Sequence, residues 1–277
     1  MSAALIRSGQ LGLGLRRDPA GDARLLATSK TFSLMASARA PKAIDNRSWL
    51  ESLSQGAMGS CEGNDLAANG TILNWYKTGE KVRMSRMWCY LRSQYHFGNL
   101  GSDSGASIPS GIETAKTDGF CTEKTFPYPN PVRYSTAIPP EAFTEAKPHV
   151  IHSSTVLKNY AEGFAYLATG VGVISIGINW VESTAENQNG LIETESGSSL
   201  GGHALSINGY TERKDKQGRN YLLLLNSHGT GWGSKGWAEI SPAMIDYWIQ
   251  TGMGFIGLSD LVEYGERDLR ELIGEML

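Results

Sequence analysis

The sequence predicts an α+β fold in which a mostly helical first half precedes a mostly β second half. Apolar residues recur at helical spacing over 65–76, 85–97 and 109–117, whereas short apolar runs typical of strands follow the proline-rich stretch 126–140. With 277 residues, the chain is long enough to bury a large core, as one domain or as two lobes that share it. Any cleft is expected between the two halves.

The first 42 residues are rich in Gly, Ala, Arg and Ser and show weak periodicity. We expect an extended or partly ordered arm over 1–42, at least part of which packs on the rest of the chain. The peptide chain that follows is expected to form a helical lobe over about 43–145, with the helix over 109–117 ended by Asp118-Gly119.

The β lobe is expected over about 146–262, so that the two lobes make one domain over 43–262. Its strands are predicted over 171–178, 203–210, 221–225 and 236–240. Between two of them, residues 211–220 are strongly polar and predict a solvated hairpin tip. Apolar residues at helical spacing then predict a C-terminal helix over 263–277.

The composition is that of an ordinary soluble protein, with 40% hydrophobic and 19% charged residues. A net charge of −3 and a pI near 6.0 give no electrostatic footprint for nucleic acid, so we expect no nucleic-acid partner. The N-terminus lacks the apolar core of a secretory signal, and the longest apolar runs are too short to cross a bilayer. We therefore expect a cytoplasmic protein without a membrane partner, and leave its oligomeric state open.

Three cysteines cannot form a disulfide framework. Cys89 lies in an expected helix and Cys121 at a turn, so both are interpreted as small buried side chains, although a bond between them stays open. The histidines and acids have no metal-ligand spacing, and we expect neither a metal nor another cofactor.

Cys61 has a different setting, because it ends the glycine-rich run Gln-Gly-Ala-Met-Gly-Ser-Cys at the start of an expected helix. Unpaired amides and the positive end of the helix dipole favour a thiolate there, so Cys61 is a candidate nucleophile. Gln55, six residues earlier, is placed to offer its side-chain amide to an oxyanion beside the sulfur.

A thiolate nucleophile needs a base to hold its proton and a third group to orient that base. His203 stands in Gly-Gly-His-Ala at the start of an apolar strand, and Asn226 ends the strand Tyr-Leu-Leu-Leu-Leu-Asn before a glycine-rich loop. Both are candidates for these roles.

Taken in order, the three motifs resemble the papain family of cysteine peptidases, and the resemblance covers roughly residues 44–258. It implies a papain-like two-lobe fold whose central helix starts at the catalytic cysteine, beside an antiparallel, barrel-like β lobe. It also implies that Cys61 is the nucleophile, His203 the general base and acid, Asn226 its orienting partner and Gln55 an oxyanion donor. A cysteine paired with a histidine in this way is expected to be ionised, so Cys61 should be a thiolate and His203 an imidazolium at neutral pH.

By the same resemblance, substrate-binding residues are Gly105 on the backbone-binding side of the groove, and Ile108, Ile176 and Ala204 near an apolar pocket. Two positions depart from the family pattern and are expected to modulate the site. His228 replaces a common tryptophan whose ring screens the Asn–His hydrogen bond from water. The smaller, polar imidazole is expected to screen that bond less well, and its titration is expected to add a pH dependence. Glu62 replaces another tryptophan, and we expect its carboxylate to point away from Cys61, toward solvent or a basic group.

The function that this resemblance implies is hydrolysis of peptide bonds through a thioacyl intermediate, with a protein or peptide as substrate. Two alternatives stay open: an amidase or peptide transferase acting on cell-wall or isopeptide bonds, and a non-catalytic protein that retains the fold for binding. The arm, with Gly12-Leu-Gly-Leu, is similar to the short leaders of bacterial, archaeal and viral members. We therefore expect a bacterial or phage protein, with virion association or the host cytoplasm as its location in the phage case.

Overall fold

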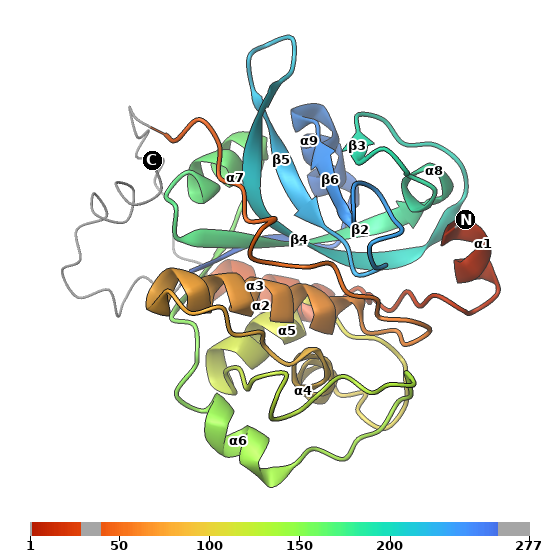
Figure 1. The fold of residues 1–277 in the computed structure, drawn as a ribbon, viewed down its shortest axis with the longest axis vertical. Helices are drawn as coiled ribbons and strands as arrows, with labels where there is room; N and C mark the ends of the chain where they lie inside the picture. Colours follow the sequence, from red (N-terminus) through yellow and green to blue (C-terminus); the bar gives the residue numbers. More distant parts are fainter. Residues whose placement is uncertain (1, 29–39, 260–277) are drawn as a thin grey trace.

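The computed structural model describes residues 2–28 and 40–259, in which most helices of the first half lie on one side of a twisted sheet and helices of the second half pack on its other side (Figure 1). The N-terminal and helical parts contain α1 Ser2–Arg7, α2 Pro19–Thr28, α3 Cys61–Thr78, α4 Arg86–Phe97, α5 Ile108–Thr117 and α6 Pro140–Ala146. The part that follows contains β1 Ser153–Val156, α7 Tyr160–Leu167, β2 Gly172–Val181, α8 Glu182–Ala185, β3 Leu191–Ile192, β4 Ser199–Lys214, β5 Asn220–Leu225, β6 Trp237–Ile240, α9 Pro242–Thr251 and β7 Phe255–Ser259.

The helices begin where side chains satisfy their first amides. Ser85 accepts a hydrogen bond from the Trp88 amide at the start of α4, and Ser107 forms a capping box with Ser110 at the start of α5. α3 has no side-chain cap, so its first amides are left for the site. The three expected helices are thus confirmed, and α3 begins four residues earlier than the sequence pattern indicates.

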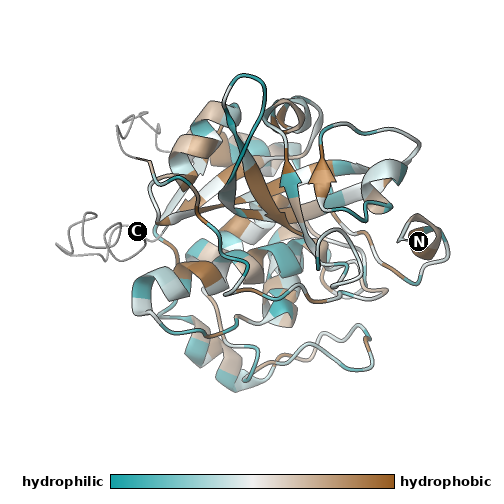
Figure 2. Ribbon diagram, turned by 45° about the horizontal axis from the view of Figure 1, so that its top comes forward, coloured by the Kyte–Doolittle hydropathy of each residue, from teal (hydrophilic) through white to brown (hydrophobic). Residues whose placement is uncertain are grey.

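The described strands form one sheet in the order β1-β7-β2-β4-β5-β6-β3. All neighbours in it pair antiparallel except β3 and β6, which pair parallel. β4 and β5 are hydrophobic in the middle and end in a hydrophilic hairpin tip, as the sequence predicts (Figure 2).

The sheet separates two cores. On one face, Leu66 and Ile72 of α3 pack with Ala204 of β4 and Leu223 of β5. On the other face, β2, β4 and β5 pack against α7 and α9, and Trp248 of α9 is buried in that cluster. The helical part therefore meets the sheet along α3, and this contact places Cys61 beside β4.

The N-terminal arm is more ordered than the sequence indicates, because α1 and α2 both form within it. Between them, the chain passes between the sheet and the helices (Figure 1). Residues 29–39 and the expected C-terminal helix lie outside the described residues. Within the described part, no helix is long and apolar enough to cross a membrane.

Candidate active site

Cys61 is the first residue of α3 and is fully buried, with 0% of its surface exposed. The backbone amides of Ala204, Gly14 and Glu62 face its sulfur and favour the ionised form. Two of these are local to the site, since Glu62 follows the cysteine and Ala204 follows His203 on β4. The third, Gly14, comes from the N-terminal arm.

His203 and Asn226 meet across the ends of β4 and β5, where Nε2 of the imidazole lies 2.8 Å from Oδ1 of Asn226. The same oxygen accepts a hydrogen bond from the Ser227 amide, so Nε2 of the neutral ring is the donor. Nδ1 is buried and has no hydrogen-bond partner, which leaves it free to take a proton. The structure thus brings the predicted base and its orienting residue together.

Gln55 is held in the loop before α3 through both ends of its amide. Its Nε2 donates to the Met58 carbonyl at 2.8 Å, and its Oε1 accepts from the Ser227 hydroxyl at 2.6 Å. Because Nε2 carries two hydrogens, one remains for an oxyanion.

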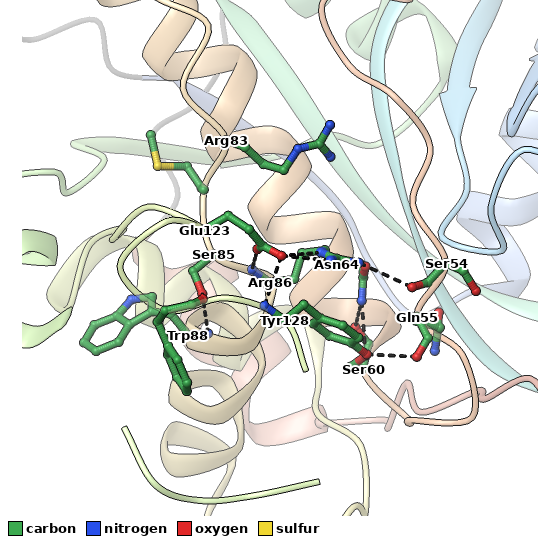
Figure 3. A network of polar contacts seen from close by, with 12 residues as sticks. Ser54, Gln55, Ser60, Asn64, Arg83, Ser85, Arg86, Trp88, Glu123 and Tyr128 are labelled. Carbon is green, nitrogen blue, oxygen red and sulfur yellow. Dashed lines mark hydrogen bonds and ion pairs between the residues drawn. The ribbon is translucent and has the colours of Figure 1, made fainter. Parts of the chain in front are cut away.

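A polar network behind this loop fixes its course (Figure 3). The Tyr128 hydroxyl donates to the Gln55 carbonyl at 2.9 Å and lies 2.6 Å from the Ser60 hydroxyl. Arg86 stacks over the Tyr128 ring and pairs with Glu123 at 2.8 Å. The loop that carries Gln55 is therefore tied to α4 and to the segment after α5.

Two aromatic rings flank the His203 imidazole. The ring centroid of His228 lies 4.6 Å away at an interplanar angle of 32°, and that of Trp180 lies 4.6 Å away at 55°. Sequence reasoning identified His228 but missed Trp180. The apolar run 171–180 indicates a strand that carries Trp180. Only the register between β2 and β4, however, shows that Trp180 and His203 lie on the same face of the sheet.

The groove at Cys61 is occupied by residues 12–16 of the arm. On the helical side, the amide of Gly12 donates to the Gly56 carbonyl at 2.8 Å. Ala106 makes two further hydrogen bonds there: its amide donates to the Gly14 carbonyl at 3.0 Å, and its carbonyl accepts from the Arg16 amide at 2.8 Å. On the sheet side, the amide of Leu15 donates to the Gly202 carbonyl at 3.2 Å. The arm thus bridges both walls and covers the sulfur.

Close backbone contacts explain the glycines of this stretch. A Cβ on Gly14 would stand 1.7 Å from the Gly59 carbonyl oxygen, and one on Gly12 would stand 2.2 Å from that of Met58. Across the groove, a Cβ on Gly105 would stand 1.8 Å from the Gly14 oxygen. Any side chain at these positions would push the arm out of the groove.

The side chain of Leu15 fills an apolar pocket between the lobes and is 5% exposed. It shares a core cluster with Ile108 and Ala204, two of the predicted pocket residues. Gly105 lies against the backbone of the arm, where its neighbour Ala106 makes the hydrogen bonds to Gly14 and Arg16. Gly177 faces Leu15, whereas Ile176 lies in the core on the opposite face, because side chains alternate along β2.

Glu62 differs from the expectation that it points toward solvent or a basic group. It is buried against α4 and α5, where the Ser93 hydroxyl faces its carboxyl. One carboxylate oxygen lies so close to Gly111 that a Cβ on this glycine would clash with it. Burial raises the pKa of Glu62 to about 8. The carboxyl is therefore largely protonated at neutral pH, and where it ionises its charge raises the pKa of Cys61.

The expected thiolate–imidazolium pair is not the favoured state of this arm-covered site. Burial raises the pKa of Cys61 to about 11, although the facing amides lower it, and burial lowers the pKa of His203 to about 4. Both shifts disfavour the charged pair. Their cause is burial, to which the arm contributes by covering the sulfur.

The remaining cysteines take no part in the site. Cys89 and Cys121 are buried free thiols, so the bond between them that the sequence left open is not formed. Among the described residues, no group of three or more His, Cys, Asp or Glu side chains is arranged to hold a metal ion.

Comparison with known proteins agrees with this geometry. A model of the papain family cysteine proteases matches residues 40–252. An uncharacterized peptidase C1-like protein of Acanthamoeba polyphaga mimivirus is 26% identical over 255 residues, which cover 80% of this chain and 79% of that protein. Cathepsin J of Mus musculus is 29% identical over 196 residues, which cover 68% of this chain and only 55% of cathepsin J.

Solved structures of cysteine proteases share the fold. Xylellain from Xylella fastidiosa aligns with a TM-score of 0.73 at 23% identity, covering 91% of this chain and 97% of xylellain. Bromelain from Ananas comosus, solved with the E64 inhibitor, aligns with a TM-score of 0.62 at 18% identity, covering 80% and 99% of the two chains. Because the family model spans most of the chain and the site has the expected order of elements, this protein belongs to the papain family and is a papain-like cysteine peptidase.

Proposed function

We propose that the protein is an endopeptidase whose catalytic residues are Cys61, His203, Asn226 and Gln55. The observation that carries the assignment is the His203–Asn226 hydrogen bond at 2.8 Å, with Nδ1 of the imidazole unpaired and the next residue of β4 facing the Cys61 sulfur. The peptidase domain extends over 43–262, preceded by the arm over 1–42, in agreement with the family match at 40–252.

In the open groove, Nδ1 of His203 takes the proton of the Cys61 thiol, and the thiolate attacks the carbonyl carbon of the scissile bond. The oxyanion is held by the backbone N–H of Cys61 and by the free N–H of Gln55, each donor lowering the barrier by about 3 kcal/mol. His203 then returns its proton to the leaving amine and a thioester remains on the sulfur. Water, deprotonated by His203, hydrolyses the thioester, releasing the acid and restoring the thiol.

The course of the arm favours an endopeptidase over an exopeptidase. Residues 12–16 enter the groove from α1 and leave it toward α2, so a continuous chain passes both ends of the cleft. A groove that holds an extended chain through backbone hydrogen bonds suits a peptide substrate better than a short isolated amide. This favours peptide bonds of proteins over the amidase alternative.

The arm holds the enzyme in a latent form. Its Gly14 presents an amide to the sulfur, and an N–H offers no carbonyl carbon for the sulfur to attack. The arm also excludes water, which keeps the catalytic pair neutral. Release of residues 12–16 therefore both opens the groove and permits ionisation.

We place the active enzyme in a reducing compartment, such as the cytoplasm. Cys89 and Cys121 are free thiols, and Met58 stands where many secreted relatives carry a disulfide cysteine. Mass analysis of the native protein from its source tests this, because a disulfide in it would contradict the placement.

The proposal is tested with a peptidyl epoxide of the E64 type, followed by mass mapping. The expected adduct lies on Cys61, and it should be absent from Cys61→Ala and far weaker in His203→Ala. Turnover of a denatured protein by the Gly14→Ala variant, but not by the same variant carrying Cys61→Ala, separates an endopeptidase from a dedicated amidase. If the Gly14→Ala variant, in which the arm is displaced and the catalytic residues are intact, still forms no adduct, the catalytic assignment is wrong.

A further inference from the structure

The pairing of β2 with β4 brings a tryptophan to the catalytic histidine. Ile178 lies opposite His203 and Trp180 opposite Gly201, so these four residues share one face of the sheet. Gly201 has no side chain, and Leu13 of the arm lies nearest to the space beside its backbone. Trp180 is fully buried, and its ring centroid lies 4.6 Å from that of His203.

The loop position that screens the histidine in most relatives holds a smaller and polar ring here. His228 lies 4.6 Å from His203 and meets Trp180 edge-on at 5.7 Å and 87°. The backbone of Gly12 in the arm faces the His228 ring, although neither ring nitrogen reaches a partner in good hydrogen-bond geometry. The large apolar cover of the catalytic histidine is therefore supplied by the strand and not by the loop.

Trp180 is itself held in place from behind. Trp232 packs on it with centroids 5.9 Å apart, and Nε1 of Trp232 donates to the Thr184 carbonyl at 2.8 Å. The β2–β4 pairing fixes the backbone on the other side. The indole can therefore hold the His203 ring in the orientation that keeps its hydrogen bond to Asn226.

We propose that Trp180 is a positioning residue for the peptidase reaction, which takes over the screening task of the missing loop tryptophan and stabilises the protonated form of His203 during catalysis. This inference rests on the proposed role of His203 as base. An aromatic face within about 6 Å of a cation attracts it, most strongly when the ring is that of tryptophan. Among the described residues, the titratable group in ring contact with His203 is His228 on the loop after β5, and the proposed nucleophile Cys61 lies nearby on α3, facing the Ala204 amide. Asn226 and Trp180, which also contact His203, are uncharged.

The test compares Trp180→Leu and Trp180→Phe in the full-length chain, with and without Gly14→Ala to open the groove. Leucine retains most of the apolar cover but lacks the aromatic face. We expect Trp180→Leu to move the alkaline limb of kcat/KM to lower pH by about 0.5 to 1 unit. Trp180→Phe should shift it less, and His228→Trp in the Trp180→Leu background should restore it.

Trp248→Leu is the matched control, because Trp248 is buried in the same core cluster but lies on α9. It should lower the melting temperature and leave the alkaline limb in place. An NMR titration of labelled histidines reports the His203 pKa without turnover, so a failure of this inference is distinguishable from an inactive wild type. If Trp180→Leu changes only the melting temperature, or if His228→Trp restores nothing, Trp180 is a packing residue and the inference is wrong.

Discussion

Leu15→Ala isolates the contribution of one side chain to latency. Leu15 is 5% exposed in the groove and becomes exposed to water when the arm leaves. Truncation to alanine therefore weakens docking of the arm by about 2 to 3 kcal/mol, without adding a clash or touching a catalytic residue. Since each 1.4 kcal/mol is a factor of ten, the closed-to-open equilibrium should fall by about 30- to 150-fold.

The assay is the second-order rate of epoxide labelling at Cys61, measured beside turnover of a peptide substrate. Cys61 has no exposed surface in the closed form, so both rates should rise by the same factor until the open form dominates. Leu26→Ala is the matched control, because Leu26 belongs to the same arm but is 61% exposed, and its rates should equal those of the wild type. Labelling of Leu15→Ala at the wild-type rate, or an equal rise in Leu26→Ala, would refute the latch.

Three further outcomes are expected. Gln55→Ala, measured in the Gly14→Ala background, should lower kcat by about 100-fold with little change in KM, because the lost amide acts on the oxyanion; an equal loss from Gln55→Glu would agree, and full activity would remove Gln55 from the site. Glu62→Gln should stabilise the fold at neutral pH. Because the folded protein raises the pKa of this carboxyl, the free energy of unfolding of the wild type is greatest below pH 4.5 and falls by about 1.4 kcal/mol per pH unit as the pH rises toward 8. In chemical denaturation, the variant should therefore gain up to about 3 kcal/mol at pH 7 and almost nothing at pH 4. His228→Trp should leave activity near neutral pH the same or higher, and a large loss would show that His228 has a task of its own.

Local pattern was sufficient for much of the fold. The periodicity over 65–76, 85–97 and 109–117 predicts helices that form as expected. The alternation that leads into β4 likewise predicts a strand. In contrast, the arm was expected to be extended or partly ordered, and its helices α1 and α2 were not predicted, because such short, weakly amphipathic segments depend on what they pack against.

The candidate site divides in the same way. The order of Gln55, Cys61, His203 and Asn226 along the chain was enough to propose their roles, and the structure brings His203 to Asn226. In the groove, Gly177 faces Leu15 of the arm, whereas the neighbouring Ile176 lies in the core on the other face of β2. A shift of one residue exchanges the two faces of a strand, and no local signal fixes that register.

The sequence by itself determined the family, the nucleophile with its expected partners, and the elements that carry them, because short-range spacing and motif order encode these features. Only the tertiary structure decided that Gly12–Arg16 lies in the groove, that Trp180 stands against His203 and that Glu62 is buried and protonated. These features depend on contacts between segments far apart in the chain and on the exclusion of water at their meeting point. For that reason, the same catalytic pair that the sequence predicts as charged is neutral beneath the arm.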